Sequence, residues 1–245
     1  MSAPLPSVED LSRPAKAFID GGKVADFGDA AELLARFVPT VVAGPDAVSY
    51  GHQAALLTAV ETTARTFEQA PVHLAPEVAG AQCILPGPIS LTVADAVLEA
   101  GGQLVDSADA LNRSRPTIVI GTAATLDDLT LQVTWDQWVA HVDTAGERLP
   151  ERGNMILAPV AAAALAVTEC FKRALGVEEA CYRRRSLNLW RPDLPFQPAQ
   201  HPTLGDDILG GRCFSSRSGV GPFGAGRWSQ FCLDDLQGEG LEFGE

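Results

Sequence analysis

The stretch Pro39-Thr40-Val41-Val42-Ala43-Gly44-Pro45 predicts a short buried strand that a turn brings to an end. Its centre is apolar and β-branched, and glycine and proline follow directly. Apolar residues then recur at helical spacing over residues 52–67, and residues 71–76 form a second short apolar run. A strand, a helix and a strand in succession are typical of an α/β domain with a parallel sheet.

The same alternation continues along the chain. Residues 117–121 form its clearest strand, with a proline before it and a glycine after it. We also predict helices over residues 31–37, 93–100 and 159–175, and strands over residues 103–105 and 129–133. The predicted fold is therefore α/β and Rossmann-like, a mostly parallel sheet with helices on both faces and right-handed crossovers.

Composition changes at both ends of this region. Residues 1–30 carry scattered prolines and mixed charges, so we expect a mobile leader with one short helix around residues 15–19. Residues 31–190 form the predicted domain. Residues 191–245 are rich in proline, glycine and serine, which predicts a linker and a poorly ordered tail.

Charge and composition exclude several classes of partner. The chain has 245 residues, 46% of them hydrophobic, and a formal net charge of −13. This charge repels nucleic-acid backbones and anionic lipid. No apolar run reaches the roughly 20 residues of a membrane span, and no signal pattern opens the chain, so we expect a cytoplasmic protein. Five scattered cysteines suit a reducing compartment and predict no metal site.

One glycine pattern resembles a nucleotide-binding turn. Residues 219–224 read Gly-Val-Gly-Pro-Phe-Gly, so Gly219, Gly221 and Gly224 are the candidate cofactor-binding residues. The preceding stretch is too polar for a buried parallel strand, and Pro222 lacks the N–H that a phosphate cradle would use. We interpret these glycines as a non-functional site and expect no cofactor in this chain.

The candidate catalytic residues are weak. His52 lies near the start of a predicted helix, where a capping or surface histidine is the more common case. Asp127 and Asp128 follow the strand at residues 117–121, on the side where open α/β sheets bind ligands, yet such a pair more often solvates a loop. His73 and His141 have no partner at a useful spacing.

Covalent catalysis has no support in the sequence. No serine lies in a G-x-S-x-G elbow, no G-x-x-x-x-G-K-[ST] loop is present, and Cys181 has no identifiable base nearby. The polar residues Asn112, Arg113 and Arg115 precede a strand, where binding is not expected. We therefore predict no catalytic and no metal-binding residue.

A resemblance to a known family accounts for the middle of the chain. It rests on Asn154-Met155-Ile156-Leu157-Ala158-Pro159-Val160, on the alanine-rich helix that follows to Leu175-Gly176, and on Ser186-Leu187-Asn188-Leu189-Trp190-Arg191-Pro192. These segments resemble the closing helix and domain junction of ThiF-type adenylyltransferases, relatives of ubiquitin-activating enzymes. The resemblance covers residues 38–192 and implies the N-terminal, non-catalytic, Rossmann-like portion of a truncated member.

This resemblance implies an architectural module that is inactive by itself. In the full-length family a second domain binds ATP and magnesium and adenylates a ubiquitin-like or sulfur-carrier protein, which would be the partner. Two alternatives stay open: a small-molecule-binding α/β protein or enzyme that uses the loops after Ala43, Ala75 and Gly121, and a standalone interaction module that pairs with a ThiF-like subunit. A homodimer is one possible assembly.

Overall fold

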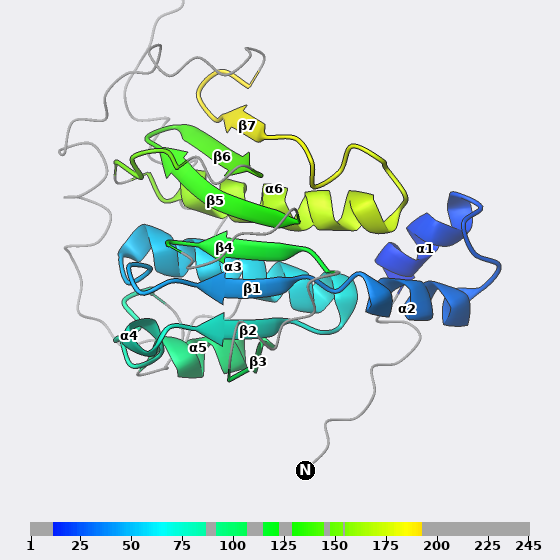
Figure 1. Cartoon of the computed structure of the whole chain (residues 1–245), viewed down its shortest axis with the longest axis horizontal. Coiled ribbons are helices and arrows are strands. Elements are labelled where there is room, and N and C mark those ends of the chain that lie inside the picture. Colours follow the sequence, from blue (N-terminus) through cyan, green and yellow to red (C-terminus); the bar gives the residue numbers. More distant parts are fainter. Residues whose placement is uncertain are drawn as a thin grey trace, which may run out of the picture. The chain divides into compact units, whose positions relative to one another are not determined.

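The computed structural model describes residues 12–86, 92–106, 115–122, 129–144, 148–153 and 155–192 (Figure 1). All of them belong to the first of two compact units, Met1–Leu209. In chain order the elements are α1 (Ser12–Asp20), α2 (Phe27–Arg36), β1 (Thr40–Ala43), α3 (Tyr50–Phe67), β2 (Pro71–Leu74), α4 (Pro76–Ala79), α5 (Val93–Glu99), β3 (Gln103–Leu104), β4 (Thr117–Ile120), β5 (Thr130–Asp136), β6 (Val139–Asp143), α6 (Leu157–Ala174) and β7 (Arg185–Asn188).

The seven described strands form one sheet in the order β3-β2-β1-β4-β5-β6-β7. Strands β1 to β5 are parallel to one another. The α/β class and the mostly parallel sheet that the sequence predicts are therefore confirmed. The strand-helix-strand unit lies where we expected it, as β1, α3 and β2, because its apolar periodicity is local and strong.

Two strands at one side of the sheet were not predicted. Strand β6 pairs antiparallel with β5, and β7 pairs antiparallel with β6. The turn between β5 and β6 contains Gln137 with φ of 52° and Trp138, so it lacks the Asn-Gly or Asp-Gly pair that marks most tight hairpins. The sequence therefore carries no turn signal at this point.

The described helices gather on one face of the sheet. Helices α3 and α6 pack against each other and against the strands, and both lie behind the sheet in Figure 1. The strand side chains on this face belong to one hydrophobic cluster with them. Its strand members are Val41, Ala43, Val72, Leu74, Ile118, Ile120, Leu131, Val133, Trp135, Ala140 and Val142. Among the described residues, the helices that we expected on both faces pack mainly on this one.

The opposite face of the sheet is partly polar. Strand residues alternate between faces, so the cross-strand row of Thr40, Thr117 and Thr130 lies opposite the hydrophobic cluster. The rows of Gln132 with Asp143 and of Thr134 with His141 share this face. All of these residues except Thr117 are buried. Val42, Val119 and Val139 lie on this face too and are also buried, so the face mixes polar and apolar residues. A parallel sheet with helices on both faces usually carries apolar residues on both sides.

Structure begins earlier than the predicted domain. The short helix expected around residues 15–19 is α1, and its Ala15 and Phe18 are fully buried. The ring of Phe18 meets the ring of Phe171 of α6 edge to face, at 5.6 Å between centroids. This apolar contact packs α1 against the core.

Helix α6 confirms the predicted alanine-rich helix. A stripe of small side chains is buried along it: Ala158, Ala162, Ala163, Ala166 and Ala174. Small residues allow α3 to approach closely. Leu165 is half-buried and packs against the edge of the hydrophobic cluster. Residues 193–245, with Gly219, Gly221 and Gly224, lie outside the described residues, as do Asn112, Arg113, Asp127 and Asp128.

Candidate functional site

The carboxyl ends of β1 and β4 form the point at which the strand order reverses. From β1 the chain passes through α3 to β2, and it returns at β4 on the other side of β1. Open α/β sheets bind their ligands in the crevice at this switch point. We therefore built the candidate site from the loops that follow β1 and β4.

The turn after β1 occupies the position of a nucleotide-binding fingerprint. It reads Gly44-Pro45-Asp46-Ala47-Val48-Ser49, so Asp46 and Ser49 stand at the second and third glycine positions of G-x-G-x-x-G. The second glycine normally lets the backbone approach a pyrophosphate. Asp46 places a carboxylate there instead. Only Gly44 matches the pattern, and a Cβ at Gly44 would overlap the carbonyl oxygen of Thr122.

Asp46 binds the loop after β4. Its Oδ1 accepts a hydrogen bond from the backbone N–H of Thr122 at 2.6 Å, and its Oδ2 accepts one from the Thr122 hydroxyl at 2.8 Å. Partial burial raises the pKa of Asp46, but these two bonds and the charge of Arg148 outweigh it and lower the pKa from 3.8 to about 2. Asp46 is therefore a carboxylate at neutral pH.

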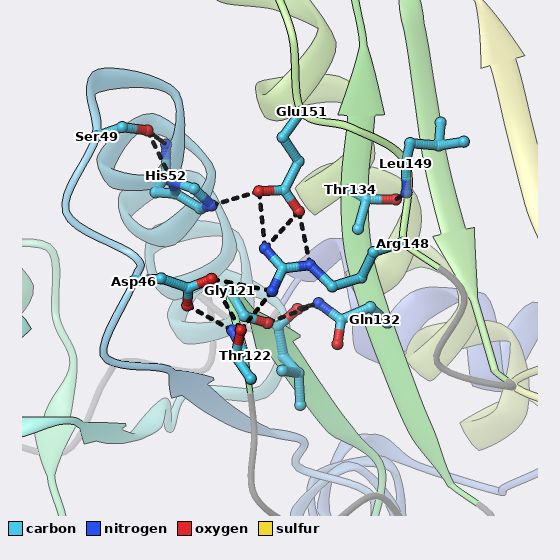
Figure 2. Close-up of polar contacts among 11 residues, drawn as sticks. Asp46, Ser49, His52, Gly121, Thr122, Gln132, Thr134, Arg148, Leu149 and Glu151 are labelled. Atoms are coloured by element: carbon cyan, nitrogen blue, oxygen red, sulfur yellow. Dashed lines mark hydrogen bonds and ion pairs between the residues drawn. The ribbon is translucent and has the colours of Figure 1, made fainter.

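Arg148 joins this carboxylate to a second one. Its Nη1 donates to Asp46 Oδ2 at 2.9 Å, and its Nε and Nη2 donate to Glu151 at 2.8 to 3.0 Å (Figure 2). Burial lowers the pKa of Arg148, but the hydrogen bonds and charges of Glu151 and Asp46 have the larger combined effect and raise it. A planar guanidinium suits this two-sided, partly bidentate contact.

His52 and Ser49 extend the network to the start of α3. Glu151 Oε2 lies 2.7 Å from His52 Nε2, and His52 Nδ1 lies 2.7 Å from Ser49 Oγ. Ser49 is also the N-cap of α3, since its Oγ accepts from the backbone N–H of His52. The edge of the His52 ring meets Trp135 at 5.0 Å between centroids.

The network runs from a buried end to an exposed end. The side chains of His52 and Glu151 are 9% and 10% exposed, Arg148 is 29% exposed and Asp46 is 42% exposed. The backbone supports the buried end, because the N–H of Glu151 donates to the carbonyl of Trp135 at 2.9 Å. Glu151 has a φ of 55°, a left-handed conformation that its surroundings must stabilise.

The structure places the other sequence candidates elsewhere. His52 is the capping-region histidine that we expected, but it is buried and paired with Glu151. His73 Nδ1 lies 3.2 Å from the carbonyl oxygen of Val105, and His141 Nδ1 lies 2.6 Å from Ser186 Oγ. Cys181 is fully buried.

Sequence reasoning missed Asp46, Arg148 and Glu151. Asp46 had a usable signal, because it follows a predicted strand at the spacing of the fingerprint's second glycine. Arg148 and Glu151 had none, since they lie 102 and 99 residues from their partners Asp46 and His52.

Two features are absent from the described residues. No group of three or more His, Cys, Asp or Glu side chains gathers as a metal site would require. In that same part of the chain, no helix combines the length and apolar character needed to cross a membrane.

Comparison with known proteins then places the chain in a family. The family described as the BilD N-terminal domain matches residues 40–189. The chain belongs to this family. The match lies within residues 38–192, the region where we noted the resemblance to ThiF-type adenylyltransferases. The matched residues span strands β1 to β7 of this chain.

A curated relative supports the same assignment. The bacterial E1-like protein BilD of Collimonas sp. (strain OK412) is 35% identical over 196 residues, which cover 74% of this chain and 40% of that protein. The chain therefore spans less than half the length of this relative. The expected kinship with ubiquitin-activating-type proteins is confirmed at the level of an E1-like family.

Proposed function

We propose that this BilD N-terminal domain is the non-adenylating, architectural module of an E1-like protein. One observation carries the proposal: at the switch point, where a Rossmann-like domain would bind a nucleotide, the chain's own charges, Asp46, Arg148 and Glu151, are joined to one another by hydrogen bonds. Asp46 repels a phosphate at the position where the second glycine would admit it. Arg148, the cation at this position, already binds two carboxylates.

The adenylation chemistry would then belong to another part of an E1-like protein. In the family that we expected from the sequence, ATP and magnesium bind there, and a ubiquitin-like or sulfur-carrier protein is the substrate. This domain would support that part, either within one protein or as a subunit that pairs with a ThiF-like partner. We place it in the cytoplasm, where ATP is available.

The small-molecule alternative is less well supported. It requires free loops after Ala43 and Gly121, and these two loops are joined by the bonds between Asp46 and Thr122. A ligand at this point would have to break charge-assisted hydrogen bonds before it could bind.

Calorimetric titration of the full chain with magnesium and ATP tests the proposal. We expect no saturable heat of binding from the wild-type protein or from Arg148→Met. Saturable binding by the wild-type chain that Arg148→Met abolishes would place a phosphate at the switch point and overturn the proposal. Arg152→Met is the matched control, because Arg152 pairs with Asp136 outside the crevice.

A second experiment tests the architectural role directly. The chain is mixed with a ThiF-like subunit from the same genome, and the mass of the complex is measured by size-exclusion chromatography with light scattering. The proposal predicts a stable complex whose nucleotide-binding capacity resides in the ThiF-like subunit.

A further inference from the structure

The buried end of the charge network contains a serine, a histidine and a carboxylate in hydrogen-bonded series. Ser49 Oγ lies 2.7 Å from His52 Nδ1, and His52 Nε2 lies 2.7 Å from Glu151 Oε2 (Figure 2). A nucleophile beside a base, with the base oriented by a third group, is the arrangement that activates a hydroxyl for attack. The sequence gives no sign of this arrangement, because Glu151 is 99 residues from His52.

The proton positions follow from the charges. Arg148 donates to both oxygens of Glu151, so we assign Glu151 as the acceptor and His52 Nε2 as the donor of their hydrogen bond. Nδ1 then accepts the proton of the Ser49 hydroxyl. The ring nitrogens exchange the roles that they have in the chymotrypsin triad, yet each imidazole nitrogen can accept a proton when the other holds one.

Backbone donors lie next to the hydroxyl. Ser49 caps α3, a helix of 18 residues, so Tyr50 and Gly51 are its first two residues. Within the described residues, neither N–H has a hydrogen-bond partner, as expected for the first turn of a helix. In the nucleophile elbow of α/β-hydrolases, the N–H of the residue after the nucleophile helps to bind the oxyanion. Tyr50 stands in that position here.

The nucleophile is accessible and its base is shielded. Ser49 is exposed, whereas His52 and Glu151 are buried. Val48 and Tyr50 flank the serine with exposed apolar surface, 43% and 36% exposed. A small acyl group can therefore approach Ser49 from solvent while the base keeps its orientation.

We propose that Ser49, His52 and Glu151 form an acyl-transfer site that hydrolyses activated carboxylic esters, an activity beyond the architectural role. Ser49 Oγ bonds to the ester carbonyl carbon while its proton moves to His52 Nδ1. The bond from carbon to the leaving oxygen breaks, and His52 returns the proton to that oxygen. Water then releases the acid by the same two proton transfers. Glu151 and Arg148 are positioning residues.

Covalent labelling of the full chain tests this site. A biotinylated fluorophosphonate is the probe, because an activated serine displaces its fluoride to form an Oγ–P bond while the hydroxyl proton leaves with the fluoride. Mass spectrometry of the digest should locate the adduct on Ser49. The chain should also hydrolyse p-nitrophenyl acetate, and His52→Ala should slow both reactions about a hundredfold.

Two pairs of variants separate catalysis from folding. Ser49→Asp keeps an N-cap oxygen but has no hydroxyl, so it should remain folded and unlabelled, whereas Ser49→Thr keeps both and should be labelled. Glu151→Asp keeps a carboxylate and should retain more of the labelling rate than Glu151→Gln. A purely structural role of Glu151 would show no such rescue of the labelling rate.

Ser186 is the internal control. Its hydroxyl also lies beside a histidine, His141, but it is in strand β7 and has no helix N-terminus next to it. Ser186→Ala should leave labelling unchanged. The proposal is overturned if folded wild-type protein, checked by circular dichroism, gives no adduct at Ser49. It is also overturned if His52→Ala is labelled at the wild-type rate, or if Ser186 is labelled as fast as Ser49.

Discussion

Replacing Arg148 by methionine tests whether the switch-point network stabilises the fold. The substitution removes the cation that joins Asp46 to Glu151 and keeps much of the side-chain volume. The Asp46 side chain is 42% exposed, so its ion pair with Arg148 contributes at most about 1 kcal/mol to the free energy of unfolding. The pair with Glu151 is different, because Glu151 is only 10% exposed and accepts three hydrogen bonds from the guanidinium.

The expected loss follows from these two contributions. Breaking a fully buried ion pair costs about 3–5 kcal/mol, and the 29% exposure of Arg148 reduces this figure. We therefore expect Arg148→Met to lower the free energy of unfolding by about 2–4 kcal/mol. For a unit of this size, that lowers the melting temperature by roughly 5–15 °C.

Urea unfolding followed by tryptophan fluorescence measures the effect, because Trp135 touches His52 of the network. The double variant Arg148→Met, Glu151→Gln leaves no unpaired buried charge. Its loss of unfolding free energy should be smaller than the sum of the two single-variant losses by at least about 1 kcal/mol. A loss below about 0.5 kcal/mol for Arg148→Met, with additive effects in the double variant, would refute the reasoning. Arg152→Met, at an arginine that is 64% exposed, should lower the free energy of unfolding much less than Arg148→Met does.

Three further predictions concern single sites. The pKa of Asp46 is about 2 when folded and near 3.8 when unfolded, so its carboxylate stabilises the fold above about pH 4 and this contribution is lost as the pH falls through 2. Asp46→Asn should therefore be less stable than wild type in urea at pH 5, and this difference should shrink as the pH falls through 2; a constant difference would contradict the assignment. Gly44→Ala should cost more than about 1 kcal/mol in thermal melts, since its Cβ would overlap the Thr122 carbonyl, whereas a Cβ at Gly80 makes only an ordinary contact with the Pro76 carbonyl oxygen at 3.8 Å, so Gly80→Ala should be nearly neutral. Ala163→Leu, at a fully buried position of α6, should cost about 1–3 kcal/mol by overpacking, and an unchanged melting temperature would place this side chain outside the core.

The sequence alone was sufficient for the α/β class and most of the sheet. The elements β1, α3, β2, β4 and α6 were predicted because each carries a strong apolar period, and a period is a local property. The alanine-rich α6 also supported the family resemblance. The family match over residues 40–189 and the E1-like relative confirm it at the level of an E1-like family. Strand β6 was missed because no glycine or asparagine marks its hairpin turn with β5. Strand β7 was missed because it is short and mostly polar, and it pairs with β6 only after the chain has passed through α6.

The candidate site was decided by the tertiary structure. The most visible glycine pattern, at residues 219–224, lies outside the described residues, while the turn at the true switch point holds Asp46 in place of a second glycine. Asp46 meets Thr122 and Arg148, which are 76 and 102 residues away, and His52 meets Glu151 across 99 residues. Periodicity records which face of its own element a residue occupies. Periodicity does not tell which distant loop the folded sheet brings next to that residue. Charged side chains this far apart in the sequence become partners only when the chain has folded.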